Sequence, residues 1–233
     1  MKLLAFDTSS PKFSLALTDG ERVLAARHMT NDRVLSSRLF PALEKLFAKA
    51  GLEPKQIDAV AVGLGPGSFT SLRVGVSAAK GLAYALQKPI VGVPSLDAAA
   101  MNVRRNDPEQ VCVLFDARRG MVYTAVYECR QGGGPARVSD HLLVEPDTVL
   151  KMLQGPVAFL GNGIPLYQEL IEQHSRAGRT QFSPVFLPQQ RWYPSAKNIA
   201  RLALARLHDG DADNIDTLAP LYLYPEDCQV RKR

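Results

Sequence analysis

The sequence has few cysteines and no arrangement of histidines typical of a metal site. Its three cysteines include no C-x-x-C pair, so neither a disulfide framework nor a zinc knuckle is expected. The four histidines lack the H-x-x-x-H or H-E-x-x-H spacing that places two imidazoles on one helical face. These residues are Cys112, Cys129 and Cys228, and His28, His141, His174 and His208. We therefore expect reduced thiols and no metal bound by this chain.

Long apolar runs are also absent. No stretch reaches the length of about 18 apolar residues that a membrane-spanning helix needs. The start, MKLLAFDTSS, has neither the apolar core nor the small-residue cleavage site of a secretory signal. These absences predict a cytoplasmic protein with no membrane partner.

A glycine-rich loop is present, but it matches no complete phosphate-binding motif. The stretch GLGPGSFTSLRVG, residues 63–75, joins an apolar run to a helix-like segment, and helix starts of this kind bind anions. No lysine follows Gly67 at the P-loop position, Ser68 replaces the third glycine of the dinucleotide fingerprint, and Pro66 removes an N–H. We interpret Gly65 and Gly67 as residues that allow a tight turn, with a weak anion site as the alternative.

The chain has an excess of basic residues. With 28 Lys and Arg against 23 Asp and Glu, its net charge is +5 at pH 7 and its pI is near 9.2, which is mild for a nucleic-acid-binding protein. We interpret the tail Arg231, Lys232 and Arg233 as solvated. Direct tRNA binding through this tail and through Arg104 and Arg105 is the alternative, and its signature would be a steep loss of affinity with added salt.

The order of apolar segments repeats once along the chain. Residues 1–106 predict the order βββαβαβα, and residues 107–233 repeat it. The first set comprises strands at 2–6, 13–17 and 21–27, a helix at 33–50, a strand at 57–64, a helix at 70–87, a strand at 90–93 and a helix from 95. The second set comprises strands at 111–115, 122–127 and 138–144, a helix at 147–153, a strand at 157–160, a helix at 165–174, a strand at 185–187 and a helix at 195–208. We predict an α/β protein of two lobes, 1–106 and 107–233, with the alternative that the helix from 195 packs back on the first lobe.

An aspartate ends the first strand of each predicted lobe. AFDTSSPKFSLAL aligns with LFDARRGMVYTAV, which places Asp7 and Asp116 in equivalent hairpins. This duplication resembles the actin-like (ASKHA) superfamily of actin, hexokinase and Hsp70, whose hairpins hold nucleotide phosphates and magnesium. A backbone that approaches a phosphate needs small residues after the aspartate, whereas Pro11 follows the first and Arg118 and Arg119 follow the second. We expect no nucleotide bound by this chain alone, with Asp7, Gly65, Gly67 and Arg118 as weak candidates.

The segment from Thr70 to Gln87 mixes small and aliphatic residues. Gly75 and Gly81 lie inside it, although a glycine costs a helix about 1 kcal/mol relative to alanine. Close packing of another backbone would compensate, and it could come from the protein's own sheet or from a helix of a second subunit. For the second alternative, the expected interface residues are Leu35, Leu39, Leu43, Leu72, Gly75, Val76, Ala79, Gly81 and Ala83.

Four stretches carry a more specific resemblance. VAVGLGPGSFTSLRVGVSAAKGLA, with FDTSS near the start, FDARRGMVY in the middle and PLYLY near the end, is similar to the TsaB family, also called YeaZ. The resemblance extends from end to end, although Ser71 stands where the family usually has glycine. The family is the bacterial accessory subunit of the machinery that makes threonylcarbamoyladenosine in tRNA.

This resemblance implies a non-catalytic scaffold and activator. It implies pairing through residues 33–50 and 70–87 with the homologous catalytic subunit TsaD, or with a second copy as a homodimer, and it implies that the ATPase TsaE joins. TsaD carries a metal-binding H-x-x-x-H in a helix, whereas residues 33–50 contain no histidine. ATP and a divalent metal would then belong to the partner subunits, and tRNA would be reached through the complex. The alternative is an ATP-binding phosphotransferase or a peptidase of the actin-like superfamily that acts on its own.

Overall fold

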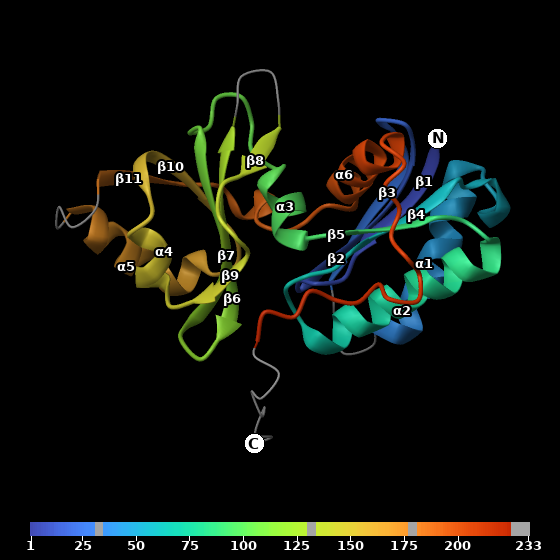
Figure 1. The fold of residues 1–233 in the computed structure, drawn as a ribbon, viewed down its shortest axis with the longest axis horizontal. Helices are drawn as coiled ribbons and strands as arrows, with labels where there is room; N and C mark the ends of the chain where they lie inside the picture. The colour runs from blue at the N-terminus through green and yellow to red at the C-terminus, as the bar shows by residue number, and fades with distance from the viewer. Residues whose placement is uncertain (31–34, 130–133, 177–180, 225–233) are drawn as a thin grey trace. The chain divides into compact units, whose positions relative to one another are not determined.

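The computed structural model describes residues 1–30, 35–129, 134–176 and 181–224. The chain divides into two compact units, drawn in Figure 1. The first consists of Met1–Asn102 and Gln190–Pro220. The second consists of Val103–Gln189 and the residues from Leu221 onward.

The first unit is built around a five-stranded mixed sheet in the order β3-β2-β1-β4-β5. β1 pairs antiparallel with β2, and β2 antiparallel with β3, whereas β1, β4 and β5 run parallel. Parallel strands need a crossover, which the helices between them supply. The elements are β1 (Lys2–Asp7), β2 (Lys12–Asp19), β3 (Arg22–Thr30), α1 (Leu35–Ala50), the 3-10 turn η1 (Pro54–Gln56), β4 (Ala59–Gly63), α2 (Phe69–Leu86), β5 (Ile90–Val93), α3 (Ser95–Ala100) and, later in the chain, α6 (Ala196–His208).

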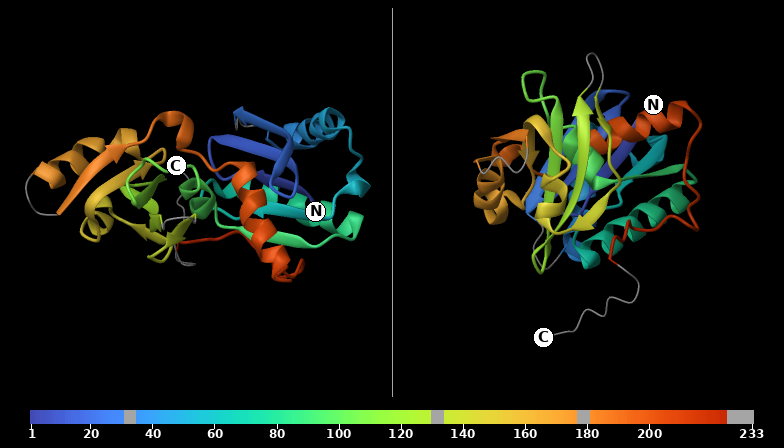
Figure 2. Two further views of the ribbon diagram at one scale, coloured as in Figure 1. Left: turned by 90° about the horizontal axis from the view of Figure 1, so that it is seen from above. Right: turned by 60° about the vertical axis from the view of Figure 1, so that its left-hand side comes forward.

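Helices cover both faces of this sheet. Side chains alternate along each strand, so that Leu4 and Phe6 of β1 join the apolar core beneath α1 and α2. Leu3 and Ala5 point the other way and pack with α6. The right-hand view of Figure 2 shows α2 and α6 on opposite sides of the strands.

The second unit contains a six-stranded sheet. Its main path has the order β11-β10-β6-β7-β8, and β9 pairs with β7 at another stretch of that strand than β8 does. Strand for strand, this path repeats the order of the first sheet. The elements are β6 (Gln110–Arg118), β7 (Met121–Cys129), β8 (Pro135–Arg137), β9 (Leu142–Val144), α4 (Pro146–Leu150), β10 (Gln154–Leu160), α5 (Ile164–Arg176) and β11 (Gln181–Phe186), followed by the 3-10 turn η2 (Gln189–Arg191).

The duplicated strand order agrees with the expected α/β repeat, and two expectations need correction. The strand expected at 138–144 is replaced by two short strands, β8 and β9. The helix expected to complete the second repeat, α6, packs instead on β1, β2, β4 and β5 of the first unit. Its apolar side chains, among them Ile199 and Ala203, fit against the small residues of that sheet. The lobe expected at 107–233 is therefore too long, and the helix from 195 packs back on the first unit.

Candidate functional site

Asp7 lies at the end of β1, and its carboxylate is bonded entirely within the first unit. The side chain is fully buried. Oδ1 accepts hydrogen bonds from the Ser9 N–H at 3.0 Å and the Ser9 hydroxyl at 2.7 Å, and Oδ2 accepts one from the Ser95 hydroxyl at 2.5 Å. Burial raises the pKa of the Asp7 carboxyl, and the bonds from Ser95 and Ser9 offset part of this rise. Both oxygens that could face a ligand thus have partners from the protein.

The glycine loop closes against the same hairpin. The Gly65 N–H donates to the Ser95 hydroxyl oxygen at 3.0 Å, and the Ser68 N–H donates to the Ser9 carbonyl at 2.9 Å. A Cβ added at Gly67 would come within 2.2 Å of the Ser9 carbonyl oxygen, so only glycine fits there. Two amides that could hold an anion are occupied, which fits the interpretation of the loop as a tight turn.

The weak nucleotide candidates therefore fall into two groups. Asp7, Gly65 and Gly67 meet in the first unit, where Ser95 links the first two. The pairing of Asp7 with Ser95 was missed because 88 positions separate them and no motif joins them. In this first group the Asp7 carboxylate accepts from Ser9 and Ser95, and the Gly65 amide donates to Ser95.

Arg118 belongs to the second unit and lies at the tip of the β6–β7 hairpin. Arg118, Arg119 and Gly120 have positive φ angles of 68°, 53° and 76°. Residues other than Gly, Asn and Asp rarely adopt this backbone conformation. The Arg118 N–H donates to Asp116 Oδ1 at 2.8 Å, and Nε lies 3.5 Å from Oδ2. The Arg118 side chain is 87% exposed. The Asp116 carboxylate is thus bonded within its own hairpin.

The residues expected at a partner interface are mostly in the core. Eight of the nine are buried, and only Gly81 is exposed. Six of the buried ones belong to the apolar cluster between the sheet and helices α1 and α2. Their side chains stabilise the unit itself and are not available to a partner, which corrects the expectation for Leu35, Leu39, Leu43, Leu72, Gly75, Val76, Ala79 and Ala83.

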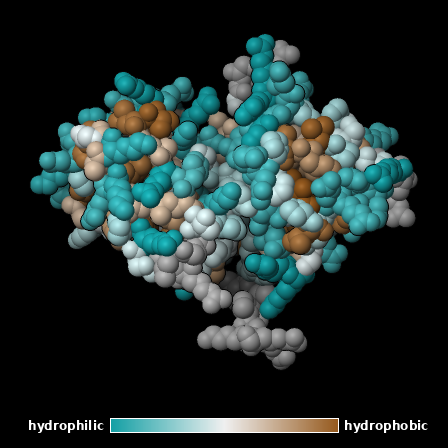
Figure 3. Space-filling view, turned by 180° about the vertical axis from the view of Figure 1, so that it is seen from behind, coloured by the Kyte–Doolittle hydropathy of each residue, from teal (hydrophilic) through white to brown (hydrophobic). Residues whose placement is uncertain are grey.

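The exposed sides of α1 and α2 carry aromatic residues that sequence reasoning missed. Phe40 of α1 is 50% exposed, and Phe69 and Tyr84 of α2 are 51% and 79% exposed. The Arg73 guanidinium lies 3.9 Å from the centroid of the Phe69 ring. The face shown in Figure 3 is mostly hydrophilic, with brown groups of apolar side chains. The sequence pattern could have indicated these exposed rings, because their positions lie outside the stripe of leucines on each helix.

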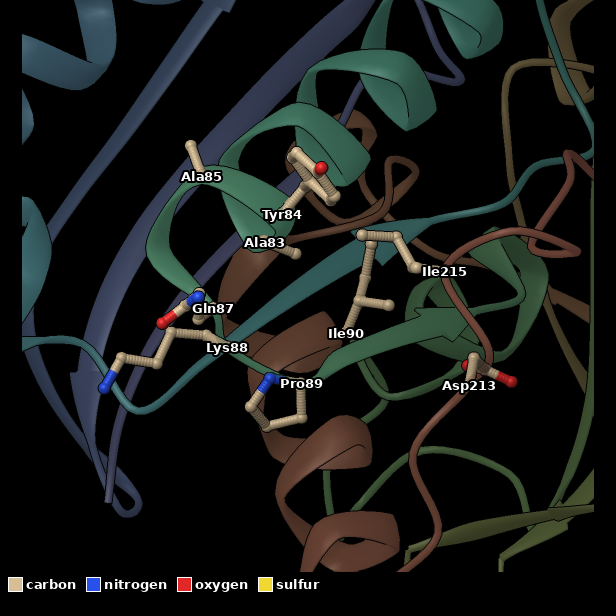
Figure 4. Close-up of a pocket in the computed structure, with 9 residues that line it drawn as sticks. All are labelled: Ala83, Tyr84, Ala85, Gln87, Lys88, Pro89, Ile90, Asp213 and Ile215. Carbon is tan, nitrogen blue, oxygen red and sulfur yellow. The ribbon is translucent and has the colours of Figure 1, made fainter.

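A groove of about 590 Å³ lies at the C-terminal end of α2. Figure 4 shows Tyr84 and Lys88 on one side of it, Ile90 on β5, and Asp213 and Ile215 on the segment that follows α6. The Asp213 N–H donates to the Ile90 carbonyl at 2.9 Å, and its Oδ2 accepts from the Gly92 N–H at 2.7 Å. This segment therefore covers the open edge of β5, which would otherwise expose unpaired backbone groups.

Arg206 and Lys80 hold the same segment in place. Arg206 pairs with Asp211 and Asp213 and donates to the Gly92 carbonyl at 2.9 Å. Lys80 Nζ donates to the carbonyls of Asp216 and Leu218, each at 3.2 Å. The right-hand view of Figure 2 follows this segment from the end of α6 toward α2. One wall of the groove beside Tyr84 is thus fixed to β5 and α2.

The cysteines offer no activated thiol among the described residues. Cys112 is buried, and burial raises its pKa to about 12. Burial also raises the pKa of Cys129, and Cys228 lies outside the described residues.

In the described ranges, no group of three or more His, Cys, Asp or Glu side chains is placed to hold a metal ion. No helix in these ranges has the length and apolar character to cross a bilayer.

Comparison with known proteins identifies the family. The family model described as "TsaD: tRNA N6-adenosine threonylcarbamoyltransferase" matches residues 29–227. A Bacillus subtilis (strain 168) protein described as "tRNA threonylcarbamoyladenosine biosynthesis protein TsaB" is 36% identical over 174 residues, 74% of this chain and 76% of the relative. The chain belongs to the TsaB family.

Solved structures agree with this membership. YeaZ from Pseudomonas aeruginosa is 29% identical, with a TM-score of 0.80 over 95% of this chain and 99% of that one. A Listeria monocytogenes protein proposed to be an N-acetylmannosamine kinase is 10% identical, with a TM-score of 0.50 over 89% of this chain and 100% of that one. The second likeness concerns the fold alone. The expected actin-like (ASKHA) fold class is confirmed for this member of the TsaB family.

Proposed function

We propose that this chain serves the formation of N6-threonylcarbamoyladenosine in tRNA as an accessory subunit that does no chemistry of its own. Membership of the TsaB family supports the pathway. The observation that supports the non-catalytic role is the Asp7–Ser95–Gly65 network. The carboxylate and the loop amide that would hold a phosphate or its metal in an actin-like enzyme are bonded to Ser95, so binding a nucleotide there would require breaking buried hydrogen bonds.

The working surface in this proposal is the exposed side of α1 and α2. Phe40, Phe69 and Tyr84 supply the exposed rings typical of interface anchors. Gly81 lies one turn before Tyr84 and offers no side chain, so a partner helix could approach its backbone closely. The partner is the homologous catalytic subunit TsaD, and a second copy of the chain would use the same surface when TsaD is absent.

The remaining parts of the assembly follow from the same division of labour. TsaE supplies the ATPase, and ATP and the divalent metal are held by the partner subunits. The tRNA is reached through the complex in the cytoplasm. In this arrangement the chain contributes a folded helical surface that stabilises and activates TsaD.

Reconstitution tests the proposal. With purified TsaD, TsaE, threonylcarbamoyladenylate and tRNA, omission of this chain should abolish most of the modification. Gly81→Arg should do the same, because an arginine there would hold a partner helix away, whereas Gln168→Arg on the exposed side of α5 should not. Modification that proceeds unchanged without the chain would overturn the proposal.

Calorimetry addresses the independent-enzyme alternative. We expect no measurable heat when magnesium and ATP are titrated into the isolated chain. Micromolar, magnesium-dependent binding would favour a phosphotransferase of the actin-like superfamily and contradict the non-catalytic role.

A further inference from the structure

Two lysines and a histidine lie on the α6 side of the first sheet, whereas α1 and α2 cover its other face. Lys12 begins β2, His28 lies near the end of β3, and Lys197 lies in the first turn of α6. In the β2–β3 register His28 is opposite Ser14. Since side chains two apart on a strand share a face, Lys12 lies on the same side as Ser14 and His28. We call these three residues the Lys12–His28–Lys197 cluster.

Ser14 joins the start of α6 to the β2–β3 pair. Its hydroxyl oxygen accepts a hydrogen bond from the Ala196 N–H at 2.8 Å, and the hydroxyl donates to the Pro194 carbonyl at 3.4 Å. Ser14 is buried, so both ends of this link are protected from water. Lys197 follows Ala196 directly and is thereby held near the β2–β3 pair. The Ala196 N–H is bonded to Ser14, so we attribute the positive charge of the cluster to its side chains and not to the N-terminus of α6.

The positive charge of the cluster is not neutralised. Within the ranges that the structure describes, no carboxylate forms an ion pair with Lys12, His28 or Lys197. Lys12 Nζ lies 5.3 Å from the centroid of the Tyr193 ring, a contact that keeps the ammonium beside that ring. Farther along α6 the charge is balanced, since Arg201 Nε lies 3.7 Å from Glu21 Oε1.

The two lysines also affect the pKa of His28. Burial lowers the pKa of His28, and the charges of Lys197 and Lys12 lower it further. When His28 is protonated, both lysines therefore repel it. An anion placed among them would relieve that repulsion, and it would favour the protonated form of His28.

We infer that the Lys12–His28–Lys197 cluster is a contact surface for the phosphate backbone of tRNA. The inference rests on the proposed function, which brings tRNA to the complex. Clustered cations without carboxylate partners are complementary to a phosphodiester chain. The cluster does not include Arg104 and Arg105, which belong to the second unit.

Filter binding of radiolabelled tRNA to the complex of the full chain with TsaD, over a series of salt concentrations, tests the inference. Lys12→Glu combined with Lys197→Glu should weaken binding at least tenfold, and the slope of log affinity against log salt should fall by about 2, one for each lost phosphate contact. The control is Lys55→Glu combined with Lys151→Glu, which makes the same charge change at exposed positions elsewhere, and it should change affinity less than about threefold. If circular dichroism shows that the charge reversal disturbs the fold, the milder pair Lys12→Gln with Lys197→Gln replaces it in the binding experiment.

Failure of this inference can be told apart from failure of the proposed function. A cluster variant that loses tRNA but still co-purifies with TsaD supports the surface. Equal losses in the cluster and control variants would indicate unspecific attraction by net charge and would overturn it. Loss of TsaD binding by the cluster variant would assign the surface to a protein partner and would also overturn it. The proposed function is tested separately by omitting the chain from the modification reaction.

Discussion

Gly75 of α2 lies directly against Thr8, the residue that follows β1. A Cβ added at Gly75 would come within 2.2 Å of the Thr8 hydroxyl oxygen, which lies 2.8 Å from the Ser71 carbonyl that it donates to. Thr8 is fully buried. Gly81, by contrast, is exposed and has no atom within 4 Å of the corresponding position. The two glycines of one helix therefore have different causes: Gly75 serves packing within the unit, and Gly81 leaves an exposed backbone open.

The two glycines should respond in opposite ways to alanine. Gly75→Ala should destabilise the first unit by about 1 to 3 kcal/mol, because the buried Thr8 must shift. Gly81→Ala should stabilise it by about 1 kcal/mol, because alanine is the better helix former at an open position. Urea denaturation of both variants measures the difference, and equal effects of the same sign would contradict the packing described for Gly75.

Removal of the Tyr84 ring should separate pairing from stability. Since Tyr84 is 79% exposed, Tyr84→Ala should change the free energy of unfolding by less than about 0.5 kcal/mol. Its affinity for TsaD should fall at least about tenfold, as expected for an aromatic anchor. Leu166→Ala on α5, at a side chain that is 60% exposed, is the control. Surface plasmon resonance that finds the same affinity in both variants would remove Tyr84 from the interface.

Asp7→Asn should change how stability depends on pH. The pKa of Asp7 in the folded chain is raised above its ordinary value of 3.8, so the folded state holds the proton more tightly than the unfolded state does. The free energy of unfolding of the wild type, relative to Asp7→Asn, should therefore fall as the pH rises from about 4 through the folded-state pKa. Chemical denaturation of both proteins from about pH 4 to pH 7 tests this, and a difference that does not vary with pH would be the contrary result.

Lys197→Gln should raise the pKa of His28. Burial and the charges of Lys197 and Lys12 hold this pKa below its ordinary value of 6.5, and loss of one charge should move it upward, although burial keeps it below 6.5. NMR titration of the His28 ring proton measures the shift, with Lys55→Gln as the control. The lowered pKa of His28 also affects stability. Because the folded state binds this proton less readily than the unfolded state does, the free energy of unfolding should fall as the pH falls below about 6.5. An unchanged His28 titration would contradict the cluster geometry.

Much of the fold could be predicted because it follows from local sequence patterns. Apolar periodicity placed the helix at 70–87, and the structure has α2 at Phe69–Leu86. The repeated strand order followed from two similar hairpins. The packing of α6 on the first sheet could not be read in this way, since it depends on small residues such as Ala5 and Ala16 that are distant from it in sequence.

The site was harder to predict because it depends on contacts between distant segments. The missing phosphate motifs predict that the glycine loop is a tight turn, with which the contacts of Gly65 and Gly67 agree, yet nothing near Asp7 in the sequence indicates Ser95. The sequence predicts the interface residues from small or apolar character, which in a helix marks the buried side as readily as a partner surface. Exposed rings such as Phe69 and Tyr84 became apparent only once the buried side of each helix was known.

The rate of threonylcarbamoyladenosine formation in a reconstituted reaction, with Asp7→Asn and Gly81→Arg compared side by side, tests the central claim most directly. Both variants should first be shown to be folded by thermal melting. If the chain acts through its helical surface, Asp7→Asn should support modification at close to the wild-type rate, and Gly81→Arg should lose most of it. A folded Asp7→Asn that abolishes modification, with Gly81→Arg fully active, would contradict the account.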